Sequence, residues 1–437
     1  MRALGLRLTL LGLAVFAAGH AHAQEPPPAA AAPTRRVVGL AEALGLAKQH
    51  QPTLRRAAAD VQVARARAEQ ARAPMLPQVN ASASYERATR NTNLRPTQSF
   101  DMGDSFGFGL SATQLVWDFG KTHDRYSAAK ESVAGQQQSE LAAAQDAAQA
   151  VRAVYFEARA ARTLLAVSEE TLANVQVHLQ QIEGFVAAGA RAEIDLAQAR
   201  TDVANARVDL ISTQNSYDSA RARLTQAVGG GLTGDFDVAD EAMPPVEGED
   251  GTTDALLARA LPARAELRAL ERQVAAQERT ADAVSGGYWP SLSVSTGLNE
   301  GGPALDDLRW NWRVGAALNW SLYQGGMTDA QRDEARASLI ALRAQLEAEQ
   351  QSIRLELEEA RLALRASKAS LEATGEAVLG ARERLRLAEG RYQAGVGSGL
   401  ELADAQLGLT AALARRVQAD YALASARSRL LRALGQE

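Results

Sequence analysis

Two periodic patterns of apolar residues alternate along this chain, and each pattern occurs more than once. In some segments apolar and polar residues alternate with a period of two, which is typical of β-strands. These strand segments span about 78–86, 105–117, 291–298 and 309–323. In longer segments the apolar residues recur every three or four positions, which is typical of helices. These helical segments span about 122–187, 191–228, 328–394 and 399–434. The pattern therefore predicts two β-hairpins, each followed by two long helices.

The helical segment 328–394 carries apolar residues that stand seven positions apart. They are Leu357, Leu364, Leu371, Val378, Leu385 and Tyr392. This heptad spacing is typical of helices that coil around a partner. A helix of about 66 residues would be on the order of 100 Å long, because each residue adds about 1.5 Å. The turn that follows it is short and contains glycine, so we expect the next helix to return antiparallel to it.

The chain also repeats itself. The segment Trp117-Asp118-Phe119-Gly120 corresponds to Tyr323-Gln324-Gly325-Gly326 at an offset of 206 residues, which holds from there to the end of the sequence. We expect a first repeat at 37–229 and a second at 254–437, joined by a Pro-rich and acidic linker at 230–253. Each repeat would contain a short helix, a β-hairpin and two long antiparallel helices. The fold class expected is mainly α with membrane β.

The first residues indicate export from the cytoplasm. Arg2 and Arg7 precede an apolar run, and Ala21-His22-Ala23 resembles a cleavage site, so residues 1–23 are interpreted as a signal peptide. The Pro/Ala-rich residues 24–36 show no periodicity and are expected to form a disordered leader.

The strand segment 309–323 has the composition of a membrane strand. Apolar and aromatic residues take one phase of the alternation and are expected to face lipid: Trp310, Trp312, Val314, Leu318 and Trp320. Arg313 and Asn319 take the other phase and would face a lumen. The alternative is a strand at the edge of a soluble sandwich. Because four strands cannot close a membrane barrel, the membrane interpretation requires several copies of the chain.

Composition and charge exclude several classes of function. The chain has no cysteine, and its 52 acidic residues exceed its 47 basic residues, so there is no basic surface for nucleic acid. We find no residue pattern for catalysis, for a metal or for a cofactor, and do not expect an enzyme. His50, His123 and His178 are isolated in the sequence and are interpreted as surface or packing residues.

Taken together, the order of these motifs resembles the TolC family of outer-membrane efflux channels. The segments that carry the resemblance are Gln51-Pro52-Thr53-Leu54, Arg264-Ala265-Glu266-Leu267, Met75-Leu76-Pro77, Tyr288-Trp289-Pro290, the two glycine motifs after the strands, and residues 391–406. The resemblance implies a homotrimer that forms a 12-stranded β-barrel in outer-membrane lipid and an α-helical barrel in the periplasm. It also implies a periplasmic adaptor protein and an inner-membrane transporter, either proton-driven or of the ABC class, as partners. The absence of cysteine indicates the non-lipidated branch of the family.

The resemblance also assigns roles to residues at the periplasmic end of the helices. Glu401, Asp404 and Asp195 match carboxylates that constrict and gate the pore; the alternative is that they are ordinary acids near helix N-termini. Tyr392 and Asp195 match a hydrogen-bonded pair that holds the end closed. A linking arginine of the family is replaced here by Gly397, and Arg191 is the expected substitute. The turns, which would also contact the adaptor, contain Gly189, Gly395, Gly397, Ser398 and Gly399.

The function expected is a passive exit duct for small molecules in a tripartite efflux pump. The sequence leaves open an alternative on the same fold, the exit channel of a type I protein secretion system. An alternative of another class is a periplasmic coiled-coil scaffold without a pore.

Overall fold

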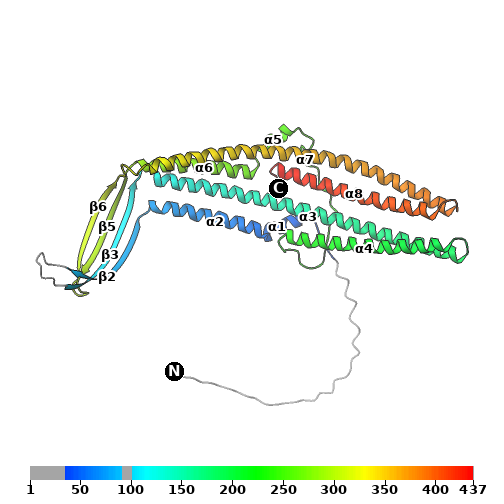
Figure 1. Ribbon diagram of the computed structural model, residues 1–437, viewed down its shortest axis with the longest axis horizontal. Helices are drawn as coiled ribbons and strands as arrows, with labels where there is room; N and C mark the ends of the chain where they lie inside the picture. The colour runs from blue at the N-terminus through cyan, green and yellow to red at the C-terminus, as the bar shows by residue number, and fades with distance from the viewer. Residues whose placement is uncertain (1–34, 91–100, 437) are drawn as a thin grey trace, which may run out of the picture.

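The chain folds into a long body with a β-sheet at one end (Figure 1). At the other end, two turns each connect a pair of antiparallel helices. The structure is a computed structural model that describes residues 35–90 and 101–436. The expected signal peptide at 1–23 lies outside the described residues, as does all but the end of the expected leader at 24–36. The prediction of a mainly helical fold with a β portion is confirmed.

Two helices of 67 residues, α3 (Lys121–Ala187) and α7 (Met327–Gln393), run along most of the body. Shorter helices pack beside them. On the half nearer the sheet these are α2 (Pro52–Arg72) and α6 (Ala265–Ser285). On the other half they are α4 (Glu193–Ala227) and α8 (Gly399–Ala433). The short helices α1 (Leu40–His50) and α5 (Thr253–Ala260) lie near the middle (Figure 1).

The heptad residues of α7 form its packed face. Leu357, Leu364, Val378 and Tyr392 are buried, while Leu371 and Leu385 are partly buried against the same cores. The other faces of α7 carry charged residues and some exposed leucines, so this seam is what packs α7 against the rest of the fold. Across the described residues, no helix is both long enough and apolar enough to cross a bilayer.

The sheet contains four strands in the order β2-β3-β5-β6, and every neighbouring pair is antiparallel. The strands are β2 (Gln78–Arg90), β3 (Asp101–Trp117), β5 (Ser291–Gly302) and β6 (Arg309–Asn319). The last strand is shorter than the predicted 309–323. It ends at Asn319 because the chain then turns toward α7, and the Trp320 indole Nε1 donates a hydrogen bond to the Tyr288 carbonyl oxygen at 3.0 Å.

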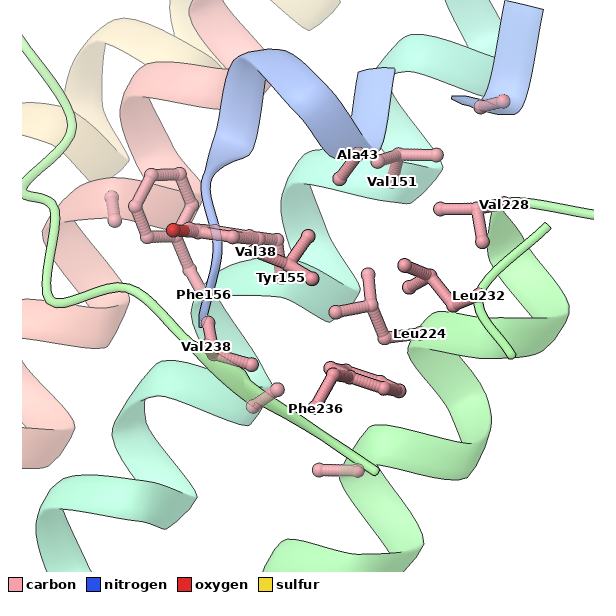
Figure 2. Packing of buried hydrophobic residues seen from close by; sticks show 14 of the residues in the cluster. Val38, Ala43, Val151, Tyr155, Phe156, Leu224, Val228, Leu232, Phe236 and Val238 are labelled. Atoms are coloured by element: carbon pink, nitrogen blue, oxygen red, sulfur yellow. The ribbon is translucent and has the colours of Figure 1, made fainter. Parts of the chain in front are cut away.

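The end of the expected leader and part of the expected linker meet in a small parallel sheet at the middle of the body. Strand β1 (Arg36–Val38) pairs with β4 (Phe236–Val238), so the prediction of a disordered leader was wrong at Arg36. The physical reason is burial: Val38 and Val238 are fully buried against Tyr155 and Phe156 of α3 (Figure 2). The Tyr155 hydroxyl donates to the Ala239 carbonyl oxygen at 3.1 Å, which fixes the linker to α3.

The rest of the linker is held by an ion cluster around Glu249. The Glu249 side chain is 7% exposed. Its Oε2 lies 3.1 Å from Arg427 Nε, and its Oε1 lies 2.6 Å from Lys368 Nζ. The Val246 backbone N–H also donates to Oε2 at 2.8 Å. Burial alone would raise the pKa of Glu249, but these bonds outweigh burial and lower the pKa to about 2. We call this packed linker the collar; it lies against the middle of α7 and the C-terminal part of α8.

Candidate functional site

The first part of the candidate site is the sheet, whose two faces differ sharply in chemistry. Directly paired residues in antiparallel strands point to the same face. The pairs Tyr85 with Phe106 and Leu298 with Trp312 therefore lie on one face, together with Val314 and its alternating neighbours. The apolar residues of this face are Val79, Ala81, Ala83, Tyr85, Phe106, Phe108, Leu110, Ala112, Leu292, Val294, Leu298, Trp310, Trp312, Val314, Ala316 and Leu318. Gln114, Thr296 and Glu300 lie among them, and the directly paired Arg87 and Asp104 lie on the same face beyond Tyr85 and Phe106.

The opposite face of the sheet is polar or small, with Leu115 as an exception. It consists of Asn80, Ser82, Ser84, Gly107, Gly109, Ser111, Ser293, Ser295, Gly297, Asn299, Asn311, Arg313, Gly315, Ala317 and Asn319, with their alternating neighbours. The expected division between Val314 and Leu318 on one side and Arg313 and Asn319 on the other matches these pairings. In one chain the apolar face has no cover: Trp310 is 73% exposed and Leu318 is 66% exposed.

Three aromatic residues form a cluster at the end of the sheet that adjoins the helices. The ring of Phe119 stacks on that of Trp289 at 5.3 Å and meets Trp117 edge-on at 6.1 Å. Phe119 has a φ of 55°, the left-handed region that disfavours a bulky side chain. This contact joins the two repeats where the sheet meets the helices, which is where aromatic girdles of membrane barrels lie.

The second part of the candidate site is the tip, by which we mean the turns 188–192 and 394–398 with the adjoining helix ends. Gly189 and Gly395 have φ of 69° and 75°, so both turns use glycine in the left-handed region that ends helices. Gly397 is required for a different reason, since a Cβ there would lie 2.9 Å from the Tyr392 nitrogen. Ser398 caps α8, with its hydroxyl accepting a hydrogen bond from the Glu401 N–H at 3.1 Å.

In the single chain, Tyr392 and Asp195 do not form the hydrogen bond that the family pattern implies for a closed tip. Tyr392 is 5% exposed, and its hydroxyl has no partner among the described residues. The Arg191 guanidinium lies over the Tyr392 ring, 4.5 Å from its centre, which is cation–π geometry. Arg191 therefore contacts the ring of Tyr392 rather than its hydroxyl.

His178 completes this contact and was not singled out from the sequence as a site residue. Its ring meets Tyr392 edge-on at 5.4 Å. Burial lowers the pKa of His178, against the opposing influence of the nearby acids Asp202 and Glu389. An isolated histidine gives no sequence signal for such a role, because its partner lies on α7, more than 200 residues away.

Of the candidate gate acids, Glu401 and Asp404 lie on α8 and Asp195 lies in the first turn of α4. Glu401 forms an ion pair with Arg391 at 3.1 Å. Asp404 lies one turn further along and is exposed, and no ion pair for it occurs in the described part of the chain. Leu402 and Ala405, the residues that directly follow Glu401 and Asp404, are buried against α7. The pairing of Glu401 reduces its free charge, a feature that the sequence did not indicate.

No group of three or more potential metal ligands occurs among residues 35–90 and 101–436.

Comparisons with known proteins agree with this geometry. The model of the family described as "Outer membrane efflux protein" matches residues 43–230 and 256–436. The pyoverdine export outer membrane protein OpmQ of Pseudomonas aeruginosa is 26% identical over 389 residues, which is 87% of this chain and 81% of OpmQ. The outer membrane protein TolC of Vibrio cholerae is 25% identical over 374 residues, which is 84% of this chain and 83% of that protein.

Solved structures share the fold. The crystal structure of CusC superposes with a TM-score of 0.80 at 21% identity, covering 95% of this chain and 99% of CusC. That of VceC from Vibrio cholerae superposes with a TM-score of 0.77 at 21% identity, covering 91% of this chain and 96% of VceC.

Proposed function

Because this chain belongs to the outer membrane efflux protein family, we propose that it is the outer-membrane exit duct of a tripartite efflux pump. It would conduct small molecules passively from a periplasmic adaptor and an inner-membrane transporter to the exterior. The relatives OpmQ and OprJ carry names of export or outer membrane proteins, which supports this assignment.

The observation that carries the proposal is the separation of apolar and polar residues onto the two faces of the sheet. An apolar outer face and a polar inner face are what a membrane barrel around an aqueous lumen requires. The same sheet continues into helices of 67 residues, long enough to extend a tube far from the membrane. A periplasmic scaffold without a pore would not require a sheet with one apolar and one polar face. The sheet therefore favours the duct over the scaffold.

Closure of the barrel requires other copies of the chain. Strands β2 and β6 are the two edges of the sheet, and unpaired edge groups are intolerable in lipid. Three copies would supply twelve strands, as the family resemblance implies. In that homotrimer the edge of β6 would pair with β2 of the next copy.

The tip is proposed as the gate and as the docking end for the adaptor. Three copies of Glu401 and Asp404, with Asp195, would place rings of carboxylates around the narrow end of the tube. The contact of Arg191 with Tyr392 would hold the hairpin of the first repeat against that of the second. The glycine turns would present the surface for the adaptor.

Single-channel recording of the detergent-purified protein in planar lipid bilayers tests the proposal. We expect discrete conductance steps from an assembly larger than one chain. A protein that stays monomeric in detergent and gives no conductance would contradict it. A second measurement is drug accumulation in a strain that lacks its own exit duct, with and without this chain and its cognate adaptor and transporter.

A further inference from the structure

A cavity of about 440 Å³ lies where β3 ends and α3 begins, at the end of the sheet that adjoins the helices (Figure 1). Apolar and polar side chains share its lining, among them Met75, Val116, Trp117, Asp118, Thr122 and His123. Trp117 pairs with Leu292, so it also belongs to the apolar face of the sheet. The cavity therefore adjoins the face that we assign to lipid.

The second repeat contains the same backbone frame around this place. In the first repeat the Gln114 side-chain nitrogen donates to the Met75 carbonyl oxygen at 2.9 Å. Gln114 corresponds to Trp320 at the offset of 206 residues, and Met75 corresponds to Tyr288 at the offset of 213 that applies before each hairpin. The Trp320 indole nitrogen donates to the Tyr288 carbonyl oxygen at 3.0 Å. An equivalent hydrogen bond thus fixes the backbone in both repeats.

The side chains inside this frame differ between the repeats. In the second repeat the Tyr288 hydroxyl donates to the Asp329 carboxylate at 2.5 Å and bridges the space. The same positions in the first repeat are Met75 and His123. A thioether has no hydrogen to donate, so Met75 cannot form such a bridge as a donor. The first repeat keeps a cavity between residues whose counterparts are joined in the second.

We propose that this cavity binds the headgroup of a glycerophospholipid from the periplasmic leaflet of the outer membrane, and that the headgroup is phosphoethanolamine. The site belongs to the first repeat of each chain. This inference rests on the proposed duct, because a sheet embedded in lipid is what brings a leaflet to the end of β3.

The first polar residue of the site, His123, suits the phosphate of this headgroup. It can donate an imidazole N–H to a phosphate oxygen whether the ring is neutral or charged. It also lies in the first turn of α3, where the helix dipole favours an anion. At the corresponding position the second repeat has Asp329, whose negative charge would repel phosphate.

The second polar residue, Asp118, suits the ammonium group. Its Oδ2 accepts a hydrogen bond from the Thr122 backbone N–H at 2.8 Å and another from the Thr122 hydroxyl. Among the described residues nothing donates to its Oδ1, which leaves this oxygen for a ligand cation. A headgroup with phosphate as its only charge would place a second negative charge beside Asp118. The cavity therefore favours the zwitterion over an anionic headgroup.

The apolar lining residues suit the part of the lipid next to the headgroup. Val116 is 51% exposed and Trp117 is 59% exposed in the single chain, so both can contact the first acyl carbons. Tryptophan is enriched at this depth of a membrane because its ring is apolar and its N–H is polar.

Native mass spectrometry of the whole assembly counts bound lipids and tests the site. The protein is placed in nanodiscs that contain equal amounts of phosphatidylethanolamine and phosphatidylglycerol with the same acyl chains, and the lipids that it retains after release are identified by mass. Met75→Tyr with His123→Asp copies the bridge of the second repeat and should close the cavity. His123→Ala leaves the cavity open but removes the phosphate donor. The control is Tyr288→Phe, which changes only the second repeat.

We expect the unaltered protein and the control to retain one phosphatidylethanolamine per chain. The double variant should lose this lipid, and His123→Ala should retain less of it. Equal retention by the double variant and the unaltered protein would mean an adventitious lipid only, and would overturn the site, as would no retained lipid in the unaltered protein. Phosphatidylglycerol retained in place of phosphatidylethanolamine would overturn the choice of headgroup.

A neighbouring copy is the other possible occupant of the cavity. Tyr323 follows β6 and is 87% exposed, and β6 would pair with β2 of the next copy. Because the chain has no cysteine, Met75→Cys with Tyr323→Cys reports this contact. We expect no disulfide between chains; covalent multimers would place the neighbour in the cavity and overturn the lipid site.

Conductance of the same preparations separates the two proposals. Channels that retain no phosphatidylethanolamine reject only the lipid site, whereas a chain that neither assembles nor conducts rejects the duct as well.

Discussion

Arg191 lies over the aromatic ring of Tyr392, with its guanidinium carbon 4.5 Å from the ring centre. The contact connects the turn of the first repeat to α7 of the second at the tip of the molecule. Because the Tyr392 hydroxyl has no partner in the described part of the chain, the ring carries the link.

The variant Tyr392→Phe should therefore keep the tip closed and leave stability unchanged or slightly higher, since the lost hydroxyl is buried and unpaired. Arg191→Ala should weaken the link by about 0.5–2 kcal/mol, the range of a cation–π contact. Resting conductance of single channels in bilayers measures both effects.

The matched comparison is Asp195→Ala, which removes the residue expected from the family pattern to bind Tyr392. If Tyr392→Phe and Asp195→Ala open the channel equally while Arg191→Ala does not, the hydroxyl forms the link in the assembled duct and our interpretation fails.

The acids of α8 should control ion selectivity at the tip. Replacement of both Glu401 and Asp404 by Ala should reduce cation preference and remove block by trivalent cations, because stacked carboxylates in a narrow pore create a negative potential. Arg391→Ala should have the opposite effect, since it frees Glu401 from its ion pair at 3.1 Å. Reversal potentials in asymmetric salt measure the preference.

The control is Glu347→Ala with Glu359→Ala, two exposed acids on α7 that lie away from the tip. Unchanged selectivity in the Glu401 and Asp404 variant, or an equal loss in the control, would show that the constriction lies elsewhere.

The collar should lose stability in acid because of Glu249. Its pKa in the folded protein is about 2, well below the usual value of 4.5, so the folded state favours the charged form. This stabilisation is present above pH 4.5 and is lost as the pH falls toward 2. It amounts to about 3 kcal/mol at neutral pH, at about 1.4 kcal/mol per unit of pKa. Glu249→Gln should remove it, and urea unfolding at pH 7 and pH 3 measures the loss.

Glu358→Gln is the matched control, because the pKa of Glu358 is also about 2, but the Glu358 side chain, which pairs with Arg361, is 35% exposed where that of Glu249 is 7% exposed. Water screens that pair, so the control should change unfolding much less. Equal losses in the two variants would mean that burial of Glu249 does not matter.

Arginine substitutions at two neighbouring alanines of β6 compare the two faces of this strand. Ala316→Arg places a charge on the apolar face beside Val314 and Leu318, and should cost about 2–4 kcal/mol near the middle of a bilayer. Ala317→Arg places the same charge on the polar face beside Arg313 and should be tolerated. Yield of assembled protein in the outer membrane measures the difference. Equal yields would contradict the assignment of the apolar face to lipid.

The sequence by itself determined the four strands of the large sheet, the four long helices and their order. Local periodicity encodes whether a segment is a strand or a helix, and the offset of 206 residues between Trp117 and Tyr323 encodes the duplication. The faces of the sheet followed as well, because side chains alternate along any strand regardless of what the strand pairs with.

Only the tertiary structure decided which distant side chains meet. Arg191 rather than Asp195 contacts Tyr392, Glu401 pairs with Arg391, and the linker forms strand β4 and buries Glu249 against Arg427. Each outcome depends on how separate segments pack. Arg191 and Glu249 lie about 200 residues from their partners, and no local periodicity of the sequence specifies such pairs. The strands and helices are specified by patterns among neighbouring residues, whereas the contacts of the tip and the collar are specified by how distant segments pack.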